Sequence, residues 1–154
     1  MSSNKHKNKG KRKLQPLQYI KEESSNTLIS REKIERSNYQ DEPLFSFKYL
    51  SDESIKESND SKFFKDFLAR LRKLSQLGWK GIQISGKHQY GFEMLPVNAI
   101  KPRYQLPSIL TPDVEKVMVF RAVGDNRPFV CIRIQNIIYV LFIETKFGDI
   151  YDHE

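Results

Sequence analysis

The chain has only one cysteine in 154 residues, so no intrachain disulfide can form and a reducing, cytoplasmic setting is expected. That residue, Cys131, lies in an apolar segment and is expected to be a small buried hydrophobe. Long apolar runs are also lacking, because the longest, residues 137–143, falls far short of the roughly 20 residues that span a bilayer. No apolar stretch follows the basic N-terminus, so the sequence predicts neither secretion nor membrane insertion.

The sequence also lacks the motifs of several enzyme classes. It has no HExxH or CxxC pattern and no carboxylates at ligand spacing, so we expect neither a metal nor another cofactor. It has no GxSxG and no glycine-rich nucleotide loop, and its cysteine falls in an apolar strand, which argues against serine and thiol nucleophiles. The classes that remain are metal-free chemistry and plain binding.

Acidic residues are missing from the first 13 positions, which hold six lysines and arginines. This tail carries most of the net charge of +7, because residues 44–154 are only mildly basic, with sixteen basic and thirteen acidic side chains. Such a tail binds polyanions through counterion release without selecting RNA, DNA or an anionic surface. A nuclear address and an inert solubilising tail are the alternatives.

The composition divides the chain into a tail and one domain. Residues 1–43 are rich in Lys, Ser, Asn, Glu and Gln, with too few apolar side chains to offset chain ordering, and are predicted to be disordered. Within this tail, residues 27–36 have enough helical character to form a short helix on a partner. Residues 44–154 are expected to form a single α+β domain.

The first half of that domain is predicted to hold one strand and one long helix. Residues 44–50 alternate as a half-buried strand does. Residues 61–77 have apolar positions at helical spacing, with Ser61 as the N-cap and Gly78 to end the helix. The opposite side of this helix is basic and is expected to be a solvated face; the alternative is that it contacts phosphates.

The segment between this helix and the C-terminal third gives weaker signals. Ile82 and Ile84 suggest a short strand, and residues 92–95 suggest another extended piece. Residues 101–112 contain three prolines, so a loop across the surface is expected there.

The C-terminal third is predicted to form a three-stranded antiparallel meander. Its β-branched and aromatic runs cover residues 117–120, 129–134 and 137–143. Turn-forming residues at 124–126 and 135–136 separate these runs. The predicted fold is therefore a small antiparallel sheet, made of this meander and the N-terminal strand, packed on one amphipathic helix.

Three arginines, Arg121, Arg127 and Arg133, recur in the meander at a spacing of six residues. If side chains alternate strictly along the strand of residues 129–134, Arg133 lies on the face opposite to Ile132 and Ile134. One face of the sheet is then core and the other is a candidate site. The alternative is that these arginines are solvated on an exposed sheet face.

Further basic, phenolic and imidazole groups lie in a glycine-bracketed segment with Lys87 and His88, and in the C-terminal segment with Lys146, Tyr151 and His153. Metal-free RNA cleavage needs a base for the 2′-hydroxyl, cations for the charge growing on phosphorus, and an acid for the leaving 5′-oxygen. These side chains include groups that can act as the base, the cations and the acid. The alternative for His88 is an ordinary histidine of a surface loop.

The order of the predicted elements resembles the RelE/ParE toxin superfamily of bacterial toxin–antitoxin systems, as does the segment VFRAVGDNRPFVCIRIQNIIYVLFIETKFGDIYDH. The shared pattern is a strand, a Gly-Asp-x-Arg turn, two further strands and a short segment with a terminal Tyr. This RelE-like resemblance implies a cytoplasmic protein of prokaryotic or phage origin, with RNA or the ribosome as its target and a protein antitoxin as its partner.

The resemblance also implies roles for individual residues. Arg127 matches the turn arginine, and Arg121 and Arg133 fall on strands that bear phosphate-binding residues in RNA-cleaving members. The positions of the C-terminal catalytic side chains are matched by Lys146, Tyr151 and His153.

The chain departs from the family pattern where a glycine- and proline-rich segment replaces the second helix, and some family members act on gyrase without nuclease activity. The sequence therefore predicts an RNA-binding protein that acts as a metal-independent, toxin-like endoribonuclease, with His88, Arg127, Tyr151 and His153 as catalytic residues. Lys87, Lys146 and the two strand arginines, Arg121 and Arg133, are expected to bind phosphates. The alternative is a non-catalytic module that binds nucleic acid or protein.

Overall fold

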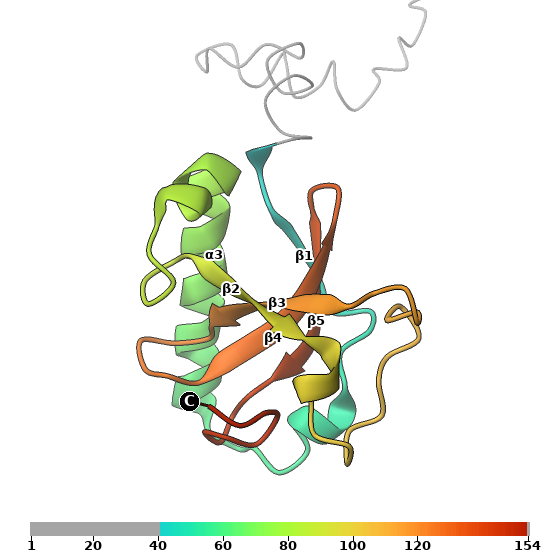
Figure 1. Ribbon diagram of the computed structural model, residues 1–154. Coiled ribbons are helices and arrows are strands. Elements are labelled where there is room, and N and C mark those ends of the chain that lie inside the picture. Colours follow the sequence, from blue (N-terminus) through green and yellow to red (C-terminus); the bar gives the residue numbers. More distant parts are fainter. Residues whose placement is uncertain (1–40, 154) are drawn as a thin grey trace, which may run out of the picture. The chain divides into compact units, whose positions relative to one another are not determined.

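The computed structural model describes residues 41–153, which form an α+β domain, as predicted; one long helix lies beside a sheet of five strands, one more than the predicted meander and N-terminal strand (Figure 1). The predicted disordered tail, apart from its last three residues, and the short helix expected within it lie outside the described residues. The elements are β1 (Leu44–Ser46), α3 (Ser61–Ile84), β2 (Phe92–Pro96), β3 (Lys116–Arg121), β4 (Pro128–Ile134) and β5 (Ile137–Ile143). Two short 3-10 helices, η1 (Asp52–Ser54) and η2 (Val97–Ala99), complete them.

The strand order is β1-β5-β4-β3-β2, and the meander of β3, β4 and β5 is antiparallel as predicted. The N-terminal strand differs from the prediction, because β1 runs parallel to β5, with Leu44 opposite Ile137 and Ser46 opposite Tyr139. Alternation of apolar residues sets which side of a strand is buried, but it carries no information about strand direction. The sheet is therefore mixed rather than wholly antiparallel.

The N-cap of helix α3 lies one residue earlier in the chain than the sequence predicts. Asp60, not Ser61, is the N-cap, and its side chain accepts a hydrogen bond of 3.0 Å from the amide of Phe63. The chain turns at Gly78, where φ is +67°, but a further helical turn and a half follow it up to Ile84. The short strand expected around Ile82 is therefore wrong. Trp79 and Ile82 are both buried, and their packing holds this last segment helical.

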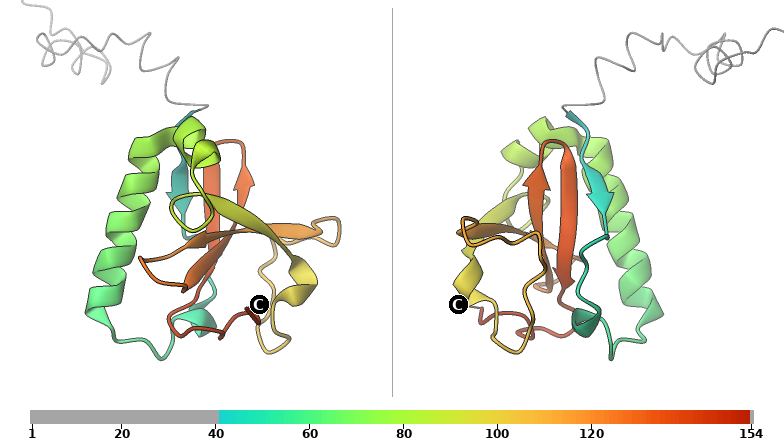
Figure 2. Two further views of the ribbon diagram at one scale, coloured as in Figure 1. Left: turned by 60° about the vertical axis from the view of Figure 1, so that its left-hand side comes forward. Right: turned by 90° about the vertical axis from the view of Figure 1, so that its right-hand side faces the viewer.

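Both faces of the sheet carry a buried hydrophobic cluster, whereas the sequence predicted one core face and one face with a candidate site (Figure 2). Helix α3 covers the first face, where Phe67 and Leu74 pack against Phe120 and Phe129. The loop after η2 and the C-terminal segment cover the second face with Ile100, Tyr104, Ile150 and Tyr151. Cys131 is fully buried in the core between α3 and the first face, as predicted, and burial raises the pKa of its thiol.

We expect Gly78→Ala to lower the free energy of unfolding by about 1–2 kcal/mol, because left-handed backbone disfavours a Cβ atom. A Cβ there would also lie 3.1 Å from the carbonyl oxygen of Asp41. Thermal unfolding measures the change. The matched control is Gly124→Ala, where the new Cβ meets nothing within 4 Å, and an equal loss in both variants would contradict the strain assigned to Gly78.

Candidate functional site

A cavity of about 620 Å³ opens on the second face of the sheet, beside the edge strand β2. We call it the Arg121 cavity. The end of β3, the β2 strand, the loop before β2 and the C-terminal segment each contribute to its lining. Five residues predicted as site residues from the sequence line it, namely Lys87, His88, Arg121, Tyr151 and His153. These residues lie up to 66 positions apart in the chain, and the fold brings them together.

Arg121 is fixed in the Arg121 cavity by two contacts. Its guanidinium donates to the carbonyl oxygen of Asp125 at 3.0 Å, and its other terminal nitrogen lies 2.5 Å from Nδ1 of His88. A guanidinium can only donate, so Nδ1 of His88 accepts, and the proton of the neutral ring lies on Nε2. The structure thus leaves Nε2 of His88 free to donate to a ligand.

A tight loop between α3 and β2 places His88 against Arg121. The amide of Tyr90 donates to the side chain of Ser85, and the amide of Gly91 donates to the carbonyl of Gly86 at 3.0 Å. A side chain at Gly91 would collide with the carbonyl oxygen of Ser85, so this loop closes only with glycine there. His88 itself is exposed at the tip of the loop.

His153 is held by Glu144, a residue that the sequence reasoning missed. Glu144 is fully buried, and its carboxylate accepts from Nε2 of His153 at 2.7 Å and from the backbone amides of Gly148 and Ile150. With the proton on Nε2, the neutral imidazole has its lone pair on Nδ1, which can take a proton. The one available signal was an acidic residue directly after the seven apolar residues of β5.

Three rings stack beside the Arg121 cavity. His153 lies between Phe147 and Tyr151, with ring centroids 4.2 Å and 4.3 Å away. Burial raises the pKa of the Tyr151 phenol, and the nearby charges of Glu144 and Glu93 raise it further. Tyr151 therefore keeps its proton at neutral pH.

The charges of the Arg121 cavity are balanced except at Arg121. Lys87 pairs with Glu93 at 3.2 Å, and Asp152 pairs with Lys101 at 3.1 Å. Arg121 forms no ion pair with any carboxylate among residues 41–153, although it lies in the same cavity. A cation without a carboxylate partner in a concave site is suited to bind an anion.

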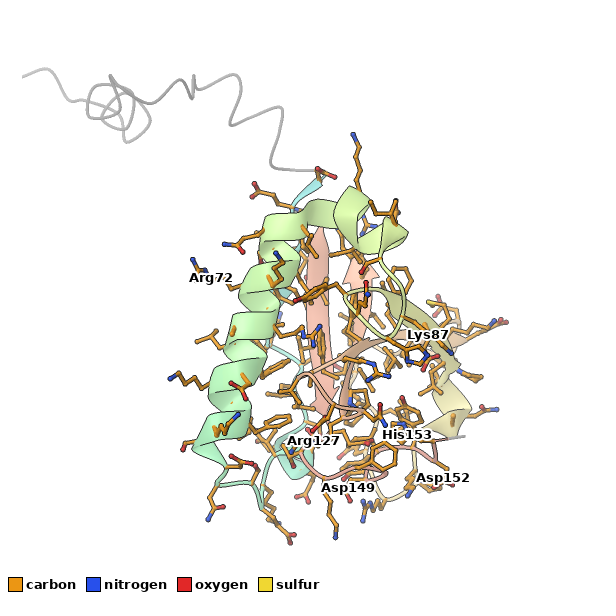
Figure 3. All side chains as sticks on the ribbon, turned by 90° about the vertical axis from the view of Figure 1, so that its left-hand side faces the viewer. Arg72, Lys87, Arg127, Asp149, Asp152 and His153 are labelled. Carbon is orange, nitrogen blue, oxygen red and sulfur yellow. The ribbon has the colours of Figure 1, made fainter. Side chains whose placement is uncertain are left out.

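The other predicted site residues lie elsewhere. Arg127 donates to Asp125 and to the carbonyl of Thr145 and stacks on Phe63 at 4.4 Å, so its guanidinium ties the β3–β4 turn to α3 and to the end of β5. Figure 3 shows Arg127 beside the lower end of α3, and Lys87 and His153 farther from the helix, on the side opposite to the outward-pointing Arg72.

Arg133 and Lys146 are also outside the Arg121 cavity. Arg133 lies over the ring of Trp79 at 3.6 Å, at the opposite end of β4 from the cavity. Strict alternation did place it on the face opposite to Ile132, but that face is packed against α3. Lys146 lines a separate polar cavity of about 550 Å³ near η1.

A network of side chains ties the C-terminal segment to the loop after η2. Lys101 donates to the carbonyl of Gly148 at 2.6 Å, and both Arg103 and the hydroxyl of Tyr104 donate to Asp149. Burial opposes ionisation of Asp149, but the hydrogen bonds from Tyr104 and Arg103 outweigh it and lower the pKa of that carboxyl. The segment that carries Tyr151 and His153 is thus fixed at several points.

We expect stability to fall as the pH rises from about 10 to about 12, because burial and the bond to Asp149 raise the pKa of Tyr104 from its usual 10.0 to about 12. In that range the unfolded chain loses the phenolic proton first, which favours unfolding. Urea unfolding at a series of pH values should show a shallower fall for Tyr104→Phe. The control is Tyr139→Phe, which removes a hydroxyl without a hydrogen bond to another described residue; equal slopes for Tyr104→Phe and wild type would contradict the assignment.

Residues 41–153 contain no helix that is long and apolar enough to cross a membrane. In the same part of the chain, no group of three or more histidine, cysteine, aspartate and glutamate side chains is placed to hold a metal ion.

Comparison of the chain with protein-family models, with curated proteins and with solved structures found no match. The resemblance to the RelE/ParE superfamily therefore stays a prediction from the sequence.

Proposed function

We propose that the protein binds RNA at the Arg121 cavity and cleaves it through the RNA's own 2′-hydroxyl, without a metal. The observation that carries this proposal is the grouping of Arg121, which has no carboxylate partner in the described residues, with two histidines in one cavity. Phosphodiester cleavage needs a cation, a base and an acid at one phosphate. Arg121, His153 and His88 supply these three groups.

In the proposed reaction His153 is the general base. Its Nδ1 takes the proton of the 2′-hydroxyl, and the 2′-oxygen attacks phosphorus while the bond to the 5′-oxygen breaks. Glu144 holds the opposite nitrogen and stabilises the imidazolium that forms, in the same way that a buried aspartate serves a catalytic histidine. The products are a 2′,3′-cyclic phosphate and a 5′-hydroxyl.

Arg121 and His88 act together in this proposal. When Arg121 turns from His88 to a bound phosphate, Nδ1 of His88 is free to take a proton. The resulting imidazolium donates a proton to the leaving 5′-oxygen, and Arg121 stabilises the charge on the phosphate. Tyr151, which keeps its proton, supports His153 by stacking rather than by proton transfer.

The second candidate is a non-catalytic module that binds nucleic acid or protein. It is favoured by the ring contacts of His153, which is enclosed by Phe147, Tyr151 and Glu144 and is only 16% exposed. In this reading Glu144 and His153 only fasten the C-terminal segment. The basic residues 1–13 then supply most of the nucleic-acid affinity.

The experiment that separates these candidates is induced expression of the wild type, His88→Ala and Arg72→Ala, with growth and total RNA measured in the same cultures. The nuclease proposal expects growth arrest and RNA cleavage with the wild type and with Arg72→Ala, and relief of both with His88→Ala. Arg72 is the matched control, because its side chain lies exposed on the outer side of α3 (Figure 3). Intact RNA and normal growth with the wild type would contradict the proposal.

A further inference from the structure

Phe147 is an exposed aromatic residue at the Arg121 cavity. Its residue surface is 53% exposed, although most large apolar residues of the C-terminal third are buried. It lies in the short segment after β5 and lines the Arg121 cavity together with Arg121 and Lys87. The exposed ring of Phe147 does not contribute to the core, since it belongs to neither hydrophobic cluster.

The position of the Phe147 ring is fixed on one face by His153. Phe147 stacks on His153 with a centroid distance of 4.2 Å and an interplanar angle of 28°, and His153 stacks on the buried Tyr151. His153 is in turn held by Glu144, whose carboxylate also accepts from the amide next to Phe147, that of Gly148, at 2.6 Å. The three rings form a short stack that ends in solvent at Phe147.

We propose that Phe147 is a stacking platform for a nucleobase, so that the ligand of the Arg121 cavity is single-stranded RNA with one base unstacked from its neighbours. A base on the open side of Phe147 extends the existing stack by one ring. Its phosphate is then directed to Arg121, the cation of the same cavity that has no carboxylate partner among residues 41–153. Duplex RNA is a poor ligand in this arrangement, because its bases are stacked on one another and its edges are paired.

This inference rests on the proposed function, because the base needs the RNA backbone to be held at Arg121. It adds a prediction that phosphate binding alone does not make: affinity depends on the base as well as on the charge. The basic N-terminal tail contributes to the binding of any RNA, but its contribution depends on charge and is equal for two probes of equal charge.

The test uses the full chain and two short single-stranded probes of equal length and charge, one a 2′-O-methyl oligonucleotide and one its abasic counterpart. The quantity measured is the ratio of their dissociation constants, which removes the contribution of the tail. In the wild type the probe with bases should bind about tenfold more tightly. Phe147→Leu should bring this ratio close to one, and Phe147→Trp should keep it or increase it.

The matched control is Phe47→Leu, which alters a phenylalanine of similar exposure, 46%, outside the Arg121 cavity. It should leave the ratio unchanged. An unchanged ratio in Phe147→Leu, or a wild-type ratio near one, would overturn the stacking role. If the protein does not bind RNA at Arg121, the Arg121→Ala variant will bind both probes with wild-type affinity. This result differs from those that overturn the stacking role, which concern the ratio of the two dissociation constants.

Discussion

Glu144→Ala should lower the free energy of unfolding by about 3–5 kcal/mol, which is the largest loss of stability expected for an exchange of one polar residue in this domain. Glu144 is fully buried and accepts hydrogen bonds from two backbone amides and from Nε2 of His153. Alanine leaves these three donors without their acceptor and opens a cavity where the carboxylate lies. Thermal unfolding should show a fall in Tm of about 10 °C or more.

The control for this prediction is Glu115→Ala, because Glu115 is exposed and its side chain makes no hydrogen bond to a described residue. It should change Tm by little. Glu144→Gln separates shape from charge, since the amide keeps an acceptor oxygen of similar size but carries no charge. A loss in Glu144→Ala no larger than that in Glu115→Ala would mean that the C-terminal segment is held in another way.

Arg121→Ala should lower the rate of RNA cleavage by about 100- to 1000-fold, the usual cost of removing one donor that stabilises transition-state charge. Arg121 has no carboxylate partner among the described residues, so its charge is available to a phosphate. The exchange should not disturb a core, because Arg121 is only half-buried at the end of β3.

Two further variants sharpen this result. Arg121→Lys keeps the charge but loses the planar fork of donors, so it should recover only part of the rate. Arg72→Ala removes the same charge from the outer side of α3 and should leave the rate unchanged. Equal rates for Arg121→Ala and Arg72→Ala would show that general charge, and not the Arg121 cavity, accounts for the activity.

The strands of the meander could be predicted from the sequence because their signals are local. Three apolar runs are separated by turn residues, and the observed β3, β4 and β5 follow these runs closely. The helix was predictable up to Gly78 for the same reason. Its continuation to Ile84 was not, because it depends on burial of Trp79 and Ile82 against distant residues.

The candidate site could be predicted only in part, for a different reason. A spacing of six residues identified Arg121, Arg127 and Arg133 together, but spacing does not tell what lies opposite each side chain. The fold places Arg127 on Phe63 and Arg133 on Trp79, and only Arg121 in the cavity. Glu144 was missed because its importance lies in the amides and the histidine that converge on it after the chain has folded.

The most direct test of the proposed RNA cleavage is incubation of the purified full chain with a defined single-stranded RNA in the presence of a chelator, followed by analysis of the product ends. The account predicts cleavage that persists in the chelator, yields a 2′,3′-cyclic phosphate and a 5′-hydroxyl, and stops when the nucleotide at the cleavage site is 2′-deoxy. Intact RNA under these conditions, or cleavage that continues at the 2′-deoxy position, would contradict it.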